Sequence, residues 1–136
     1  MSWRVVNPEG LDPPRGFSHG LAATSAGQLL FIAGQAPTGA DGKVVRGGFV
    51  AQFAHALRKI VRVVEEAGGS AQDLGRLTIF VTDVAQYRAS KVELGEAYRD
   101  IMARHYPAMT LVEVAALLDR DALVEIEATA VLPKKE

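Results

Sequence analysis

The last third of the chain contains two short apolar segments in which carboxylates recur. The segments are YPAMTLVEVAAL (106–117) and ALVEIEATAV (122–131). Apolar and polar residues alternate along both, which is typical of β-strands with one buried face. Glu113, Glu125 and Glu127 lie inside these predicted strands. Because an unpaired buried carboxylate costs several kcal/mol, each of them needs a structural or functional reason.

Length and composition limit the class of protein. The 136 residues fit one domain, 1–136, which is large enough to bury a core. A formal net charge of −1 does not favour nucleic acid or an anionic membrane as a partner. The absence of cysteine excludes disulfides, a thiolate nucleophile and Cys-ligated zinc. With neither a signal-peptide core nor a membrane-spanning apolar run, we expect a cytoplasmic protein.

Hydrophobic periodicity predicts two helices and six strands. The helices span about 48–67 and 86–105, and each has an apolar stripe at helical spacing. Gly27 is predicted to be a hairpin turn between the second and third strands. The predicted strands are 3–6, 17–24, 29–33, 77–82, 110–116 and 123–132.

This order implies an α+β fold, a mixed sheet with two helices on one face. The chain has no further element to cover the opposite face, and the strand at 77–82 is not strongly polar on either side. We therefore expect an oligomer that stacks these faces, with the strand carboxylates near the subunit boundaries. The alternative is a monomer with an ordinary solvated sheet face.

Three further segments accompany the two C-terminal strands. They are AGQAP (33–37), FVAQFAHALRKIVRVVEEAGG (49–69) and LTIFVTDVAQY (77–87). Together these segments resemble the RidA/YjgF family, also called the endoribonuclease L-PSP-like family, over nearly the whole chain. The resemblance implies a chorismate-mutase-like fold and a homotrimer with a central barrel of sheets and small-molecule clefts between subunits. It also implies hydrolysis of reactive imines and enamines to a 2-oxo acid and ammonia, with no cofactor.

The resemblance places the family's site on residues that have mostly lost their polar groups. Met109 stands where an arginine clamps the substrate carboxylate, and it has neither charge nor donor. We therefore expect a mostly apolar pocket, an arginine-lacking subgroup, and absent or weak 2-imino acid deamination. Four of these residues replace a polar residue of the family: Phe17 a tyrosine, Ala33 a serine, Val92 an asparagine, and Leu111 a cysteine or serine. Together with Met109, the candidate substrate-binding residues are Phe17, His19, Ala33, Gly34, Gln35, Val92 and Leu111.

Glu125 is retained from the family pattern and is the candidate catalytic residue. It is suited to orienting or activating a water molecule against an imine, enamine or ester carbon. The equal alternative is a structural carboxylate paired across a subunit boundary, and we expect this role for Glu127. Glu113 is expected to be a buried, paired structural carboxylate. The three histidines lack metal-ligand spacing, so no metal site is predicted.

Three functions remain open at this point. The first is a RidA-like homotrimer whose intersubunit pocket hydrolyses or tautomerises an imine, enamine or related carbonyl compound. The second is a non-catalytic, regulatory trimer that binds a small metabolite. The third is a ribonuclease, against which the slightly acidic charge balance argues.

Overall fold

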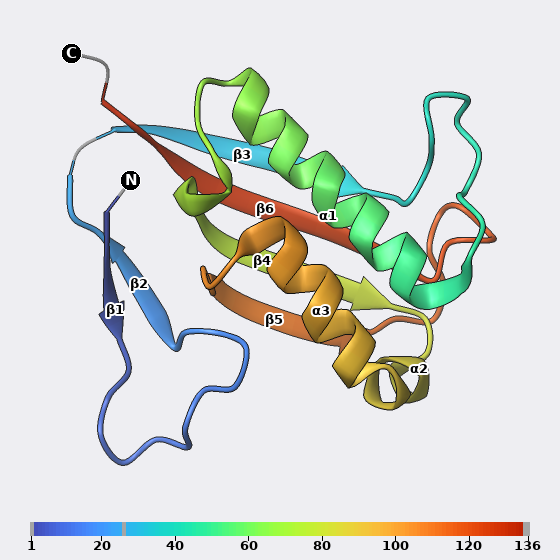
Figure 1. Ribbon diagram of the computed structural model, residues 1–136, viewed down its shortest axis with the longest axis horizontal. Coiled ribbons are helices and arrows are strands. Elements are labelled where there is room, and N and C mark those ends of the chain that lie inside the picture. Colours follow the sequence, from blue (N-terminus) through green and yellow to red (C-terminus); the bar gives the residue numbers. More distant parts are fainter. Residues whose placement is uncertain (1, 26, 135–136) are drawn as a thin grey trace.

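Four strands form the central sheet in the order β3-β6-β4-β5 (Figure 1). This computed structural model describes residues 2–25 and 27–134. Strand β6 is antiparallel to both of its neighbours, whereas β4 and β5 are parallel to each other. A parallel pair needs a long crossover, and helices supply it here. The sheet is therefore mixed, as the sequence predicts. The strands are β3 (Gly27–Gln35), β4 (Leu74–Val81), β5 (Ala108–Glu113) and β6 (Val124–Pro133).

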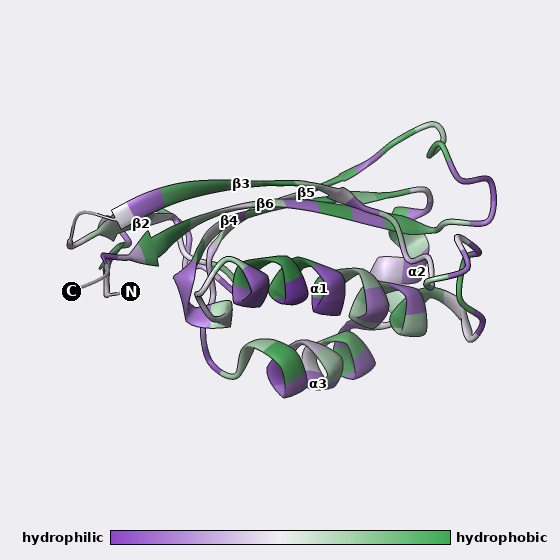
Figure 2. Cartoon of the chain, turned by 90° about the horizontal axis from the view of Figure 1, so that it is seen from above, coloured by the Kyte–Doolittle hydropathy of each residue, from purple (hydrophilic) through white to green (hydrophobic). Residues whose placement is uncertain are grey.

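Two helices, α1 (Gly48–Glu66) and α3 (Lys91–Met102), cover one face of this sheet (Figure 2). The apolar stripe predicted for the first helix is confirmed, because its side chains pack against the inward-facing residues of β4 and β6. Burial of each large aliphatic side chain contributes about 1.5–3 kcal/mol. The fully buried side chains at this contact include Leu57, Ile60, Val64, Leu77, Val81 and Ile126.

The second predicted helix, 86–105, differs from the structure, because two helices share this segment and the second ends at Met102. The first is α2 (Val84–Ala89), which Asp83 caps by accepting a hydrogen bond from the Ala85 N–H at 2.9 Å. Ser90 leaves helical geometry, and α3 follows it. Helix α3 ends at Met102, where Ala103 takes a positive φ of 54°, a conformation that a β-carbon disfavours. Local periodicity does not detect such a change of helix axis.

The N-terminal strands β1 (Trp3–Val6) and β2 (Gly20–Ala23) pair antiparallel with each other and not with the central sheet. The predicted hairpin turn at Gly27 is therefore wrong, since β3 begins at that residue. Contacts between residues far apart in the sequence hold β1 beside the start of β4. The Trp3 indole donates a hydrogen bond to the Gln72 carbonyl at 2.7 Å and lies against Gly75, where a β-carbon would come within 2.8 Å of the ring. The one-turn 3₁₀ helix Ala71–Asp73 precedes β4.

The other face of the central sheet is covered by no element of the described chain (Figure 2). Phe31 is 76% exposed on this face, and Leu29 and Val112 are also exposed. Glu125 and Glu127 lie between them, each alternating with buried neighbours of β6. The uncovered and only partly polar face that the sequence predicts is thus present. A patch of this kind is typical of a surface that binds another molecule.

Candidate functional site

Glu125, the predicted catalytic residue, and two of the predicted substrate-binding residues, Met109 and Leu111, lie on opposite faces of the sheet. Met109 and Leu111 point to the helix side and pack partly against the core. Glu125 lies on the open face of β6, with β4 between it and β5. A single chain therefore does not bring the Glu125 carboxylate to Met109.

Glu125 lies over a β-bulge. The pairing of β3 with β6 shifts between Ile32 and Gln35, and Gly34 falls inside the shift. The carboxylate occupies the space above Gly34, because a β-carbon there would come within 2.5 Å of its Oε2 atom. Within residues 2–25 and 27–134, no donor or cation lies within bonding distance of this carboxylate. It is thus available to a ligand or to a second subunit.

Ala33 and Gln35 belong to the same bulge. The Gln35 side chain folds back on its own strand, where its Nε2 donates to the Ala33 carbonyl at 3.1 Å. The structure therefore brings Ala33, Gly34, Gln35 and Glu125 together at this bulge, and their part in a ligand site stays a prediction.

Met109 opens onto a cleft of about 460 Å³ between α3, the start of β5 and the N-terminal loop. This volume is within the range of small-molecule sites. Of the residues expected in a mostly apolar pocket between subunits, this cleft contains Met109, and it also has several cationic side chains. The intersubunit pocket itself stays a prediction. The lining residues are Arg15, Gly16, Tyr87, Lys91, Leu94, Gly95, Tyr98, Arg99, Tyr106 and Met109.

Hydrogen bonds hold the N-terminal loop against the start of β5. The Ser18 N–H donates to the Pro107 carbonyl at 3.2 Å, and its hydroxyl donates to the Tyr106 carbonyl at 2.7 Å. Arg15 and Gly16 are thereby kept at the mouth of the cleft. On the opposite wall, the rings of Tyr98 and Tyr106 stack with centroids 5.4 Å apart.

The sequence profile of the Endoribonuclease L-PSP family matches residues 9–132. The chain belongs to this family, the RidA/YjgF family. The 3-aminoacrylate deaminase RutC of Acinetobacter baylyi is 32% identical over 131 residues, 96% of this chain and 98% of that protein. A RutC family protein of Pyrococcus horikoshii is 35% identical over 109 residues, 79% of this chain and 82% of that protein. The crystal structure of YyfB, a Rid family protein of Yersinia pestis, matches with a TM-score of 0.84 and 33% identity, covering 97% of this chain and all of that one. The RidA-like α+β fold predicted from the sequence is thus confirmed.

Two residues expected in the RidA-like pocket lie beside the cleft and not in its lining. The rings of Phe17 and His19 meet edge to face with centroids 5.3 Å apart. The His19 Nε2 lies 2.8 Å from the Asp12 carbonyl, and its side chain lines a separate hollow between the N-terminal hairpin and β5. Their part in the family's pocket stays a prediction.

Val92 is on the exposed side of α3, and its expected part in the RidA-like pocket stays a prediction. Val92 is 76% exposed and does not line the cleft, whereas its neighbour Lys91 does. Arg104, just beyond the end of α3, does not line the cleft either. The sequence contained a signal for the residues of α3 that line the cleft: Lys91, Gly95 and Arg99 are spaced by four residues and so share one face of a helix.

Tyr98 gives the cleft wall a pH-dependent stability. Burial, and to a smaller extent the neighbouring Tyr106, raises the pKa of its hydroxyl above the ordinary value, and the hydroxyl donates to the His105 carbonyl at 2.5 Å. Above about pH 10 the unfolded chain loses this proton while the folded chain keeps it, so the free energy of unfolding decreases as the pH rises. Denaturant unfolding from pH 8 to 11 measures this slope.

The matched variant for this measurement is Tyr98→Phe. It is expected to lose about 1 kcal/mol at neutral pH with its hydrogen bond, and to show a shallower decline above about pH 10. Equal alkaline slopes in the two proteins would contradict the assignment.

Other kinds of site are not found in the part of the chain that the structure describes. No three His, Asp or Glu side chains there gather in an arrangement suited to a metal ion. Over the same residues, no helix is long and apolar enough to cross a membrane.

Proposed function

We propose that the chain forms a homotrimer with its ligand sites between adjacent subunits. The observation that carries the proposal is that Glu125 and Met109 lie on opposite faces of one sheet. A second copy supplies the missing half, with the Glu125 group of one chain facing the Met109 cleft of the next. Contact of a neighbouring subunit with the open face also removes Phe31 and Leu29 from water, which favours assembly.

We further propose that this intersubunit site hydrolyses an enamine or imine. Protonation of the enamine carbon gives the imine, and a water molecule that Glu125 orients adds to the carbon of the C=N bond. The C–N bond then breaks, ammonia leaves, and a carbonyl compound remains. The similarity to a protein named 3-aminoacrylate deaminase makes that enamine acid the first substrate to test.

The second candidate is a trimer that binds a metabolite without turnover. The observation that favours it is Met109, because a thioether supplies neither the charge nor the donor of the family's arginine. In a binding protein, Glu125→Gln retains most of the ligand affinity. In an enzyme, the same substitution abolishes turnover.

A further prediction concerns the rate at which the protein turns over 2-imino acids. We expect turnover about 100-fold or more below that of an arginine-bearing relative, because a bidentate ion pair to the substrate is missing. Met109→Arg is expected to raise it. The measurement is release of ammonia and carbonyl product from freshly generated 2-imino acids and 3-aminoacrylate, together with the oligomer mass. Wild-type turnover equal to that of the arginine-bearing relative would show that another group holds the carboxylate.

A further inference from the structure

We propose that Gly34 is a positioning residue for Glu125. Its missing β-carbon leaves the space in which the Glu125 carboxylate rests, and the β-bulge of β3 turns that space toward the carboxylate. The inference rests on the proposed function, because it gives Gly34 a part in the same hydrolysis.

The presence of a glycine inside β3 needs a reason, since glycine weakens the interior of a strand. The usual reason is a backbone conformation with positive φ, as at Gly42 and Gly47. The φ of Gly34 is not positive, so its backbone conformation is open to any L-residue. Space around the residue, and not its backbone, therefore accounts for the glycine.

The Glu125 side chain fills this space. A β-carbon on Gly34 would lie 2.5 Å from the Oε2 atom of Glu125, 3.2 Å from its Cδ and 3.5 Å from its Cγ. No other side chain comes as close to that position. A side chain at position 34 and the observed place of the carboxylate thus exclude each other.

The bulge explains why Gly34 faces Glu125. The shift in pairing puts Ala33 and Gly34 together opposite the single residue Glu127. Both bulge residues are exposed, so the alternation of the two faces along β3 is interrupted there. Bulges redirect side chains and are frequent beside active sites. This bulge presents the bare backbone of Gly34 to the open face beneath the carboxylate.

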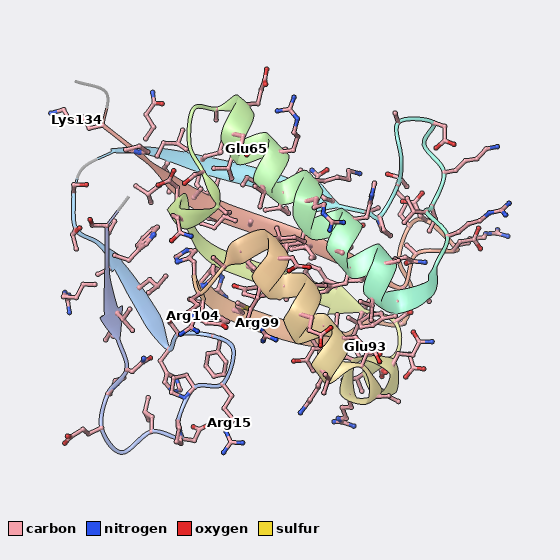
Figure 3. The ribbon with its side chains drawn as sticks, viewed as in Figure 1. Arg15, Glu65, Glu93, Arg99, Arg104 and Lys134 are labelled. Atoms are coloured by element: carbon pink, nitrogen blue, oxygen red, sulfur yellow. The ribbon has the colours of Figure 1, made fainter. Side chains whose placement is uncertain are left out.

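The other neighbours of Glu125 do not hold its carboxylate. Phe80 lies directly opposite on β4, half-buried on the open face, and the electron-rich face of its ring does not attract an anion. Figure 3 shows Arg99 on α3, and this helix covers the other face of the sheet. Because no described donor or cation fixes the carboxylate, the room over Gly34 decides where it lies.

Confinement of this kind suits a group that has to orient a water molecule. A carboxylate with few alternative positions loses little freedom when the reaction begins, and a displacement of about 1 Å can cost up to about 100-fold in rate. Gly34 thus acts on the reaction through Glu125.

The test compares turnover of freshly generated 3-aminoacrylate by intact variant proteins. Gly34→Ala is expected to lower kcat about tenfold with little change in KM, because the new β-carbon displaces the carboxylate. Gly20→Ala is the matched control, since a β-carbon there would meet Val6 at an ordinary 3.4 Å, and it is expected to behave like the wild type. Equal losses in the two variants would overturn the positioning role.

A shorter side chain at position 125 separates positioning from obstruction. Glu125→Asp removes one methylene, so its carboxylate does not extend over position 34. Added to Glu125→Asp, the Gly34→Ala change is expected to cost less than about twofold in kcat, a strongly non-additive result. A tenfold loss in both backgrounds would mean that the new methyl group obstructs the substrate or a subunit contact, and would contradict the inference.

Stability gives a readout that needs no substrate. At one fixed protein concentration, Gly34→Ala is expected to lower the denaturant midpoint of the wild type. In a Glu125→Ala background the same change is expected to leave the midpoint unchanged or raise it, because alanine restricts the unfolded chain. Equal decreases in the two backgrounds would overturn the placement of the carboxylate over Gly34.

Failure of this inference is distinguishable from failure of the proposed function. A protein that shows the stability coupling but hydrolyses no enamine refutes the proposed function and supports the placement of the carboxylate. An active protein in which Gly34→Ala retains full turnover refutes the positioning role alone.

Discussion

Phe31→Asp is expected to convert the assembled protein into a folded monomer. Phe31 is 76% exposed on the open face of β3, and stacking of these faces buries it in the proposed trimer. An aspartate there would place an unpaired carboxylate in each interface, which costs several kcal/mol.

The measurement is molar mass by light scattering, with circular dichroism to follow the fold. Val92→Asp is the matched control, because Val92 is also 76% exposed but lies on α3, on the helix side of the sheet. The control is expected to keep the mass of the wild type. If Phe31→Asp also kept that mass, the open face would not be the assembly surface.

Glu125→Gln is expected to reduce enamine hydrolysis by about 100-fold or more, the usual contribution of a positioned general acid or base. The two side chains have nearly the same shape, and within the described residues the carboxylate has no hydrogen-bond partner to lose. Fold and oligomer mass should therefore stay unchanged. Turnover within threefold of the wild type, about 0.7 kcal/mol, would remove Glu125 from the chemistry.

A mixing experiment shows whether two chains share one site. Gly95→Trp places an indole in the cleft, so this variant and Glu125→Gln are each expected to be inactive. After the two are refolded together, about a quarter of the sites should be intact, because each half is wild-type with a probability of about one half. A site built within one chain would recover no activity on mixing.

Helices and strands with a clear local sequence pattern were predictable. The stripe from Phe49 to Val64 follows from helical spacing, and the alternation around Glu125 and Glu127 follows from the pleat of a strand. The same alternation also implies that Met109 and Glu125 need not share a face, because each is placed by the pleat of its own strand. Two local predictions were wrong. The helix breaks at Ser90, and β2 pairs with β1 instead of β3.

The candidate site was only partly predictable, because its residues come from segments far apart in the chain. Glu125 and Gly34 were found by resemblance, and the structure brings them together. The cations of the cleft were missed, since a lysine or arginine on a helix is usually solvated and no pattern marks its neighbours. Val92 was expected in the family's pocket by resemblance; it does not line this cleft, and its part in that pocket stays a prediction.

The sequence by itself determined the family, most of the secondary structure elements and the uncovered sheet face. Each of these depends on local periodicity or on motifs read in order along the chain. The tertiary structure alone decided the order β3-β6-β4-β5, the attachment of the N-terminal loop through Ser18, and the meeting of Arg15, Arg99 and Met109 at one cleft. These are contacts between segments up to about a hundred residues apart, and their free energy depends on packing that no local pattern encodes.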